Sequence, residues 1–521
     1  MAWSRDPGSP QGRLHAALRP DSAEGMPELI GLLPAAGRGI RAYPYTEQIP
    51  KAMLEVDGVP ILRRNVELMR DQLGIRDIRI VVGHRDQVIR RYFGDGSQLG
   101  VRITYVSNPE VERELPYSVH LAGRDIGSHC CMILADECYL NSNHAELRRS
   151  FDPSALITLS LRASEHRKEI RKNYVVTLRD GCIVDLVEKP KIVRSGLMGT
   201  GTYLLHPDVF KHLADAYAKG PEQCPHDWTS WIAELARSGE KILPFHLEGE
   251  YVNINSRDDL NHANFLLRDR GFDERKTSLI LFVEDQEESA ADSLERFFAR
   301  PEIDEIIAIT RRPLAALERA AARHSIPVLT PSNPDLSMSE FLKLGLDKAS
   351  GDILLIAPSD DTFSPRDVSK LLVYLRDSDM VVGTRTTRQM IEQGANMRGI
   401  VRAAHFILAM LLQILWWRFD CRLTDVGCIY RGIWRSTYNS IRDNLTAEDY
   451  AVFAEMIVEV LRAHRRVIEI PINYYNPDPE ADFVRRKYQT FGTFFRGVWL
   501  MLRKRIADSN AGRLLAQRAR G

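Results

Sequence analysis

A glycine-rich turn near the start of the chain carries residues suited to phosphate chemistry. Ala36, Gly37 and Gly39 follow an apolar run, and Arg41 and Lys51 come soon after them. Glycines after a strand let the backbone approach a phosphate closely, and free N–H groups there can hold its oxygens. The two cations add positive charge where a leaving pyrophosphate would need it. The spacing excludes a Walker loop and a dinucleotide fingerprint, because neither a Gly-Lys-Ser/Thr nor a Gly-x-Gly-x-x-Gly pattern is present.

A carboxylate is expected near the same turn. Asp136 ends the apolar run 131–135, which predicts that it lies at the carboxyl edge of a parallel sheet, where ligands bind in open α/β folds. Transfer of a phosphoryl group depends on positioning, cations and a metal ion, and the metal needs hard oxygen ligands. The alternative is an aspartate that only caps a turn at the end of a strand.

The elements that must position these residues alternate between strands and helices, which predicts an α/β fold with mostly parallel sheets. A chain of 521 residues is too long for one core, so two or more domains are expected. A second strand–helix series begins near residue 277, and we place the boundary near residue 270. The expected segments are a disordered leader at 1–27, domains at 28–268 and 277–505, and a basic tail at 506–521.

Composition narrows the class of protein. The formal net charge is zero, so there is no overall signal for nucleic-acid binding. Seven scattered cysteines without C-x-x-C spacing favour free thiols in a reducing, cytoplasmic compartment and argue against a zinc site. The leader lacks the apolar segment of a signal peptide, and the longest apolar stretch, 405–419, is shorter than the ~20 residues needed to span a bilayer.

The carboxyl-terminal segment is strongly basic. From residue 485 to the end it carries ten Lys and Arg against one acid, Asp508, with aromatic residues interleaved. This composition fits the surface of an anionic membrane. The alternative is a solvated helix whose apolar side packs on its own domain, and the sequence does not choose between the two. Peripheral contact with the inner face of the cell membrane therefore remains an expectation.

The glycine-rich turn with Arg41 and Pro50-Lys51 resembles the signature of the sugar-1-phosphate nucleotidyltransferases, and the match runs over about 28–268. The resemblance implies transfer of a nucleotidyl group from an NTP (UTP, CTP or dTTP) to a sugar 1-phosphate, with release of pyrophosphate. It implies that Asp136 and Asn253 hold Mg²⁺ or Mn²⁺, although many relatives carry Asp at the second position. Ile40 also departs from the family, which commonly has Thr there.

The same resemblance assigns the remaining residues of the first site. It implies that Tyr117 and Ser118 contact the base. It implies that the sugar phosphate is bound by Glu188, Lys189, Gly201 and Tyr203. The Tyr-Ser pattern is also similar to cytidylyltransferases that act on choline or inositol phosphates. The nucleobase therefore stays open.

The second half resembles the family 2 glycosyltransferases, especially the dolichyl- or polyprenyl-phosphate sugar synthases. The motifs are an acidic turn, Asp360-Asp361, after a buried strand, then Arg385, and then Asp425 in a Thr-Asp-Val-Gly run. The resemblance implies two Rossmann-like, GT-A type domains in tandem, with Asp360 and Asp361 holding the donor's metal. Pro358 stands where the family has its first aspartate, so a weak or non-catalytic donor site is the alternative. Glu287 matches a family glutamate after the first strand.

The acceptor decides which further residues act. A polyprenyl phosphate is already anionic and needs cations, for which Arg402 and Arg431 are the candidates by resemblance. A hydroxyl acceptor needs a base, and Glu448-Asp449 is the pair to test. The alternative is that these acids begin a helix at 450–463, where negative charge favours the helix dipole.

The sequence thus predicts a bifunctional enzyme that makes a nucleotide sugar and passes the sugar to an acceptor. The alternative is a cytidylyltransferase for a non-sugar alcohol phosphate with a degenerate second domain.

Overall fold

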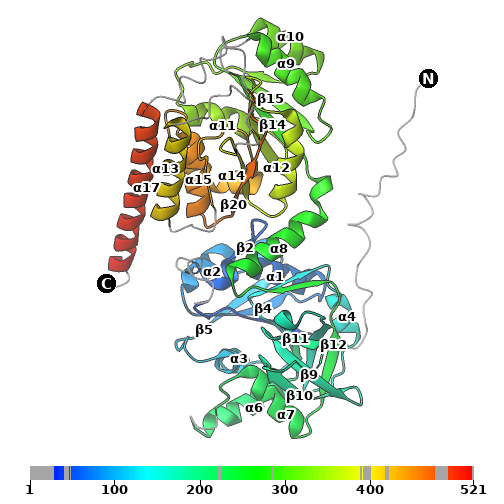
Figure 1. The fold of residues 1–521 in the computed structure, drawn as a ribbon. Helices are drawn as coiled ribbons and strands as arrows, with labels where there is room; N and C mark the ends of the chain where they lie inside the picture. The colour runs from blue at the N-terminus through cyan, green and yellow to red at the C-terminus, as the bar shows by residue number, and fades with distance from the viewer. Residues whose placement is uncertain are drawn as a thin grey trace, which may run out of the picture. The chain divides into compact units, whose positions relative to one another are not determined.

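The computed structural model describes residues 28–39, 46, 49–193, 195–220, 224–283, 287–387, 390, 400–416, 422–475 and 491–518. The chain divides into two compact units (Figure 1). The first comprises residues 1–54 and 60–255, and the second comprises residues 55–59 and 256–521.

The first unit is built on a nine-stranded mixed sheet in the order β10-β9-β11-β6-β1-β4-β5, with β8 beside β11 and β12 beside β8. The strands are β1 (Ile30–Pro34), β4 (Asp77–Val82), β5 (Arg102–Ser107), β6 (Cys130–Ile133), β8 (Ile157–Ala163), β9 (Tyr174–Arg179), β10 (Cys182–Glu188), β11 (Leu197–Leu205) and β12 (Ile242–His246). Strands β6, β1, β4 and β5 run parallel, whereas β11 is antiparallel to β6, β8 and β9. A second, two-stranded sheet pairs β7 (Glu137–Leu140) with β13 (Glu250–Asn253).

The helices of the first unit are α1 (Ile61–Asp71), α2 (Asp86–Phe93), α3 (Leu115–Gly123), α4 (His144–Arg149), α5 (Arg167–Ile170), α6 (Pro207–Ala218) and α7 (Trp228–Arg237). Local chemistry sets their ends and the turns. Asp227 caps α7 by accepting a hydrogen bond from the Ser230 amide at 2.7 Å. Asp180 and Gly181 both have positive φ, as a tight β9–β10 hairpin requires. Strands β1 and β6 are buried on both faces, which explains their continuous apolar runs.

The second unit has a seven-stranded sheet in the order β16-β15-β14-β17-β19-β18-β20. Its strands are β14 (Thr277–Val283), β15 (Glu305–Thr310), β16 (Val328–Leu329), β17 (Ile353–Pro358), β18 (Met380–Thr384), β19 (Arg431–Trp434) and β20 (Val467–Pro471). Only β19 runs antiparallel to its neighbours. The helices are α8 (Arg257–Arg270), α9 (Glu287–Phe298), α10 (Ala315–Arg323), α11 (Met338–Lys348), α12 (Val368–Leu375), α13 (Ile400–Leu415), α14 (Arg435–Ile441), α15 (Val452–Arg462) and α17 (Phe491–Arg518).

Helix α8 opens the second unit and is anchored there by a buried arginine. A Ser256–Asp259 capping box begins the helix. Near its end, Arg268 is 1% exposed, and its guanidinium donates to Asp379 Oδ1 at 2.6 Å. The same guanidinium lies 5.0 Å from the centre of the Trp434 ring, so α8 is held by both an ion pair and a cation–π contact.

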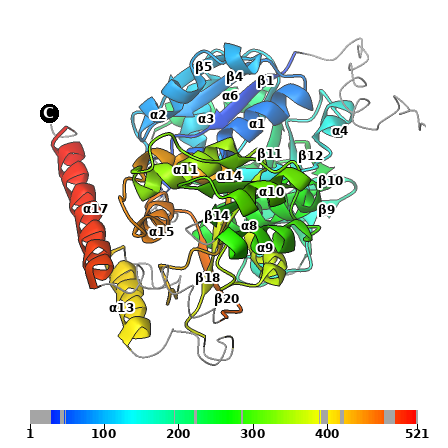
Figure 2. The same cartoon turned by 90° about the horizontal axis from the view of Figure 1, so that it is seen from above.

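The α/β class is confirmed. The apolar run 131–135 overlaps β6, the second strand–helix series begins with β14 at Thr277, and the helix expected at 450–463 corresponds to α15. Helices α13 and α17 lie side by side in the second unit, as both Figure 1 and Figure 2 show. None of the described helices combines the length and apolar character needed to cross a membrane.

Candidate active site

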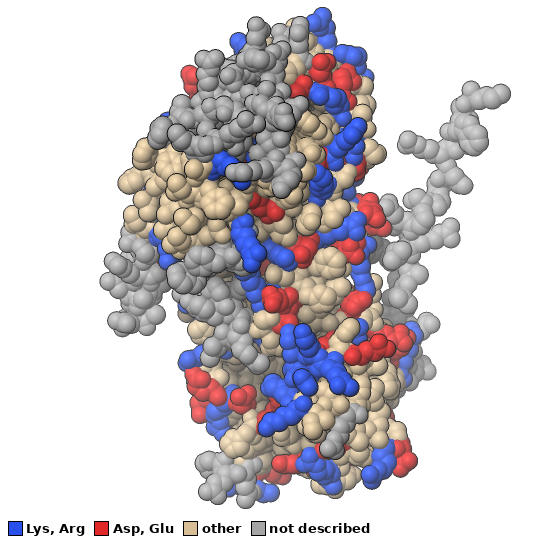
Figure 3. Space-filling model, viewed as in Figure 1, with Lys and Arg blue, Asp and Glu red and all other residues tan. Residues whose placement is uncertain are grey.

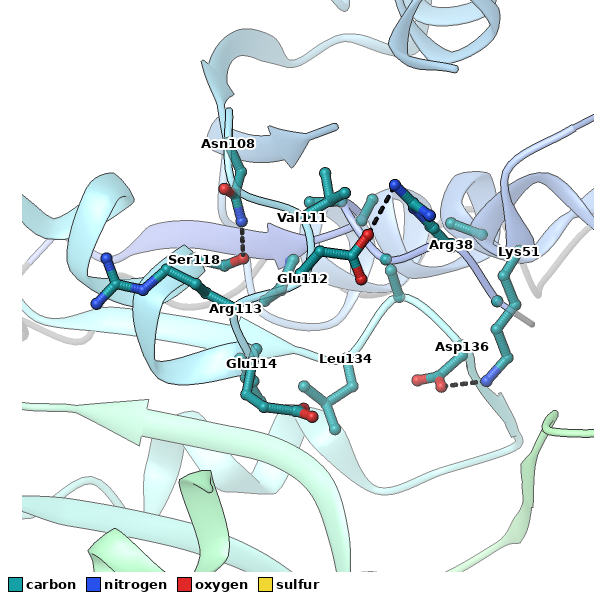
Figure 4. Close-up of a pocket in the computed structure, with 18 residues that line it drawn as sticks. Arg38, Lys51, Asn108, Val111, Glu112, Arg113, Glu114, Ser118, Leu134 and Asp136 are labelled. Atoms are coloured by element: carbon teal, nitrogen blue, oxygen red, sulfur yellow. Dashed lines mark hydrogen bonds and ion pairs between the residues drawn. The ribbon is translucent and has the colours of Figure 1, made fainter. Parts of the chain in front are cut away.

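A cavity of about 460 Å³ lies at the carboxyl ends of β1 and β6 in the first unit (Figure 4). The glycine-rich turn forms one wall, and the segment that leads into α3 forms another. Arg38 of the turn reaches this second wall and pairs with Glu112 at 2.7 Å. Lys51 and Asp136 also line the cavity. The cavity therefore lies where the strand pattern predicted a ligand.

Lys51 and Asp136 are brought together from distant parts of the chain. Lys51 Nζ lies 2.5 Å from Asp136 Oδ2 and donates to Asn255 Oδ1 at 2.9 Å. The lysine side chain is 14% exposed and the aspartate 29%, so both reach the cavity while their stems are packed. The arrangement fixes a cation and a carboxylate beside the glycine-rich turn.

The backbone of the turn is shaped by Gly39. Its φ is +63°, and a Cβ added there would lie 2.8 Å from Lys51 Cβ and 3.0 Å from a Thr46 methyl group. Only glycine accepts both the left-handed conformation and this close approach. Gly37, by contrast, faces space with no atom within 4 Å of an added Cβ. The turn thus packs against Lys51 at one glycine and leaves room at the other.

A row of asparagine side chains extends from Lys51. Asn255 donates to Asn253 Oδ1 at 2.7 Å, and Asn253 donates to Asn173 Oδ1 at 3.1 Å. The Asn173 carbonyl then accepts the backbone N–H of Lys189 at 2.8 Å. Asn255 and Asn173 were not predicted from the sequence. Asn255 lies two residues after the predicted Asn253, but nothing in the sequence pointed to Asn173.

Asp136 and the neighbouring asparagines carry oxygen atoms of the kind that a hard divalent ion takes as ligands. β13 pairs with β7 in a register that sets Asn253 opposite Glu137, and the Ile254 amide donates to the Asp136 carbonyl at 2.9 Å. One carboxylate and neighbouring amide oxygens suit Mg²⁺, which is typically held by one or two carboxylates and by substrate phosphates. No cluster of three or more His, Cys, Asp or Glu with metal-ligand geometry occurs among the described residues.

A buried glutamate supports the Asp136 turn from behind. Glu137 is 2% exposed and accepts hydrogen bonds from Tyr139 OH at 2.6 Å, Tyr251 OH at 2.8 Å and the Gly201 amide at 2.7 Å. Burial raises the pKa of Glu137 to about 7. Gly201 is required here, because an added Cβ would lie 2.4 Å from the Glu137 carboxyl carbon. Tyr203, which resemblance placed at the sugar pocket, is buried in the core.

Of the two residues predicted to contact the nucleobase, Ser118 lines the cavity and Tyr117 does not. Ser118 lines it and accepts a hydrogen bond from the Asn108 side chain at 3.0 Å. Tyr117 is not among the lining residues. Its ring lies under the Arg113 guanidinium at 4.1 Å, and its hydroxyl donates to Glu110 at 2.9 Å. Asn108 is a lining residue that the sequence argument missed.

The predicted sugar-phosphate residues Glu188 and Lys189 form an ion pair at the end of β10. A hydrogen bond with Asp227 is the largest influence that raises the pKa of the Glu188 carboxyl. Lys189 has a φ of 43°, so the turn that presents these two side chains is tight. Arg41 and Ile40 lie outside the described residues.

In the second unit, the acidic turn after β17 is engaged with its own surroundings. Asp360 accepts hydrogen bonds from the Thr362 amide at 3.2 Å and the Thr362 hydroxyl at 2.5 Å, and burial raises its pKa. Asp361 bonds to Ser293 and pairs with Arg296, both on α9. The turn lies at the carboxyl edge of β17, but each carboxylate already has protein partners.

A buried ion pair follows β18. Arg385 contacts Asp425 through two parallel hydrogen bonds of 2.7 and 2.8 Å. Against the effect of burial, the Arg385 guanidinium lowers the pKa of Asp425. His405 of α13 lies 3.2 Å from the same carboxylate, and Glu469 of β20 accepts the Thr424 and Asp425 amides. The structure therefore joins motifs that are 40 or more residues apart.

The remaining second-unit candidates differ in burial. Arg431 is fully buried, and its guanidinium donates to the carbonyls of Cys428 and Phe453. Arg402 is partly exposed on α13.

Three acids complete the set of second-unit candidates. Asp449 accepts the Ala451 amide at 2.9 Å just before α15, whereas the neighbouring Glu448 is exposed. Glu287 begins α9, but its side chain lies outside the described residues.

The nucleotidyl transferase family is the one whose model matches the amino-terminal half of the chain. The nucleotidyl transferase family model matches residues 30–268. UTP–glucose-1-phosphate uridylyltransferase AglF of Haloferax volcanii is 29% identical over 238 residues, which cover 45% of this chain and 95% of that protein. Glucose-1-phosphate thymidylyltransferase of Xanthomonas campestris pv. campestris is 28% identical over 193 residues, which cover 34% and 60%.

Solved structures are similar over the same share of the chain. A UDP-glucose pyrophosphorylase complexed with UDP-glucose is 22% identical, with a TM-score of 0.41, and the match covers 46% of this chain and 99% of that one. The cavity, its lysine–aspartate pair and the family match coincide in sequence. The nucleotidyl transferase family model thus spans the amino-terminal segment that contains this cavity.

Proposed function

We propose that the first unit transfers a nucleotidyl group from an NTP to a sugar 1-phosphate and releases pyrophosphate. The observation that carries the proposal is the placement of Lys51 beside Asp136 on the wall of the glycine-turn cavity. The names of the relatives support this reaction class with UTP or dTTP and glucose 1-phosphate as substrates.

The cavity residues suggest a division of labour. A phosphate oxygen of the sugar 1-phosphate attacks the α-phosphorus of the NTP, a new P–O bond forms, and the bond to the β-phosphate oxygen breaks as pyrophosphate leaves. Backbone N–H groups of Gly37 and Gly39 bind phosphate oxygens, and Lys51 stabilises the growing negative charge. Mg²⁺ held by Asp136 and Asn253 would supply further charge neutralisation. The position of Lys51 is fixed before the substrate binds, because Asp136 and Asn255 both accept hydrogen bonds from its ammonium group.

We further propose that the second unit accepts the nucleotide sugar and transfers the sugar to an acceptor. Two observations favour this activity: the Asp360-Asp361 turn at the carboxyl edge of β17, and the Arg385–Asp425 pair after β18. Ligands of open α/β sheets bind at such edges. A polyprenyl phosphate or a cell-surface glycan is the proposed acceptor. Joining the two activities would raise the local concentration of the intermediate.

A substrate matrix tests both proposals. The full chain is incubated with Mg²⁺, one of UTP, CTP, dTTP or GTP, and one of a panel of sugar 1-phosphates, choline phosphate and inositol phosphate. Pyrophosphate release with a sugar 1-phosphate, lost in Asp136→Asn, supports the first proposal. Release only with CTP and an alcohol phosphate would instead identify a cytidylyltransferase.

The second step is tested on the nucleotide sugar that the matrix identifies. Release of the nucleoside diphosphate in the presence of a polyprenyl phosphate, abolished by Asp360→Asn, is expected. Failure to transfer sugar to any lipid phosphate or glycan would overturn the second activity while leaving the first intact.

A further inference from the structure

Two helices of the second unit leave large apolar side chains exposed. Among the described side chains, eight of the fifteen large hydrophobic residues that are exposed lie on α13 and α17. These eight, which we call the α13–α17 apolar face, are Phe406, Ile407, Met410, Ile414, Phe495, Trp499, Leu502 and Ile506. Such a concentration is unusual on a protein surface that faces only water, and it marks an interaction site.

The exposed side of α17 cannot turn inward, because its opposite side is fixed by buried charges. Lys504 Nζ lies 2.8 Å from Glu455 Oε1 and 2.9 Å from Glu459 Oε1 of α15. Asp508 of α17 accepts a hydrogen bond from Arg462 of α15 at 2.6 Å. Rotating α17 to bury its other apolar side would leave the buried carboxylates of Glu455 and Glu459 without the Lys504 ammonium group, at high cost.

The outer face of α17 has a regular pattern. Phe495, Trp499, Leu502 and Ile506 are spaced i, i+4, i+7 and i+11, which puts them on one side of the helix. Trp499 is 64% exposed and Phe495 is 63% exposed. α13 packs closely against this helix at Gly497, where an added Cβ would lie 3.4 Å from Leu408. The exposed residues of the two helices therefore belong to neighbouring elements.

Positive charge flanks the apolar face. Arg503 and Arg505 are exposed on α17 beside the apolar row, as is Arg496, which pairs with Asp449 at 2.6 Å. Residues 485–521 contain ten Lys and Arg and a single acid, which is the already paired Asp508. In Figure 3 the surface over α13 and the upper part of α17 is mostly tan, with Lys and Arg beside it.

We propose that the α13–α17 apolar face docks onto the surface of an anionic lipid bilayer. Aromatic and aliphatic side chains on one face of a helix, with arginines at its margins, suit the boundary between lipid headgroups and acyl chains. Anionic headgroups complement the excess positive charge. The inference is independent of nucleotidyl or glycosyl transfer, because it rests only on exposure and charge.

Vesicle co-sedimentation of the full chain tests the proposal. Vesicles of phosphatidylcholine alone are compared with vesicles that also contain phosphatidylglycerol, each at low and high salt. We expect binding to the anionic vesicles, weak binding to the neutral ones, and release by salt, because screening weakens interactions between charges. Absence of binding to anionic vesicles at low salt would overturn the proposal.

Pairs of substitutions distinguish binding through the α13–α17 apolar face from nonspecific adhesion to the vesicles. Phe495→Ser with Trp499→Ser removes apolar area, and Arg503→Gln with Arg505→Gln removes charge. Each pair should weaken partitioning by about ten-fold or more. Val373→Ser with Tyr374→Ser, exposed residues of α12, is the matched control and should bind as the wild type does. Equal binding by all variants would overturn the proposal.

A second copy of the chain is the alternative occupant of the α13–α17 apolar face. Size-exclusion chromatography with light scattering is run on the wild type and on the Phe495→Ser/Trp499→Ser variant, with circular dichroism to verify that both are folded. A wild-type oligomer that this variant converts to a monomer, without vesicle binding by either, would assign the face to self-association and refute the membrane proposal. The salt and lipid dependence of the wild type tests the proposal even if the variant does not fold.

Discussion

Replacing Lys51 by Gln should separate catalysis from stability. The substitution removes the charge beside Asp136 but keeps a side chain of similar length that can donate to Asn255. In the proposed reaction the lost charge would have faced the leaving pyrophosphate. The defect should therefore appear mainly in kcat.

The expected magnitude follows from the position of the lysine. Removing one preorganised group that stabilises charge in the transition state typically costs about 10²–10³-fold in kcat, or about 3–4 kcal/mol. The Lys51–Asp136 pair is partly exposed to water, so its loss should change the free energy of unfolding by only about 1 kcal/mol. Turnover should fall far more than stability does.

The assay is pyrophosphate release by purified full-length protein with the best substrate pair from the matrix. Thermal unfolding is measured on the same samples. Lys241→Gln is the matched control, because Lys241 also pairs with an aspartate, Asp152, but does not line the cavity. If Lys51→Gln turned over within about threefold of the wild type, the role given to this lysine would be wrong.

Three further substitutions probe the supporting structure. Gly39→Ala should lower turnover sharply, because its Cβ would lie 2.8 Å from Lys51 Cβ at a positive φ; wild-type turnover would show that the turn has room for a side chain. Arg268→Ala should lower the free energy of unfolding of the second unit by about 3–5 kcal/mol in denaturant titrations, because it leaves Asp379 buried without its closest partner; a loss below about 1 kcal/mol would contradict this. Burial lowers the pKa of His144 to about 4, so the unfolded chain binds a proton between pH 6.5 and 4 that the folded chain does not. Stability should therefore fall as pH drops through that window, by up to about 3 kcal/mol, and His144→Gln should flatten the dependence; an unchanged slope in the variant would refute the assignment.

Much of the candidate site could be anticipated because its main residues follow strands. The glycine-rich turn and Asp136 each come directly after a buried parallel strand, and a strand end can be recognised from a short apolar run. Lys51 follows the turn closely enough to be assigned by spacing. Asn173 could not be found in this way, because its part in the asparagine row depends on contacts across the fold rather than on neighbours in sequence.

Burial was the property that sequence predicted least well. Tyr203 was expected at a pocket, but β11 is covered on both faces and the ring joins the core. Arg431 was a candidate cation for an acceptor, yet its guanidinium is enclosed and donates to backbone carbonyls. Residue type allows either environment in both cases, and only the packing of neighbouring elements decides.

By itself, the sequence determined the alternation of strands and helices, the glycine turn, and the acids and cations at strand ends, because each depends on a few consecutive residues. Tertiary structure decided which of these residues meet. It placed Lys51 against Asp136 and Asn255, which are 85 and 204 residues away. It also chose which apolar side of α17 is buried, since Lys504 and Asp508 find their partners on only one of its faces.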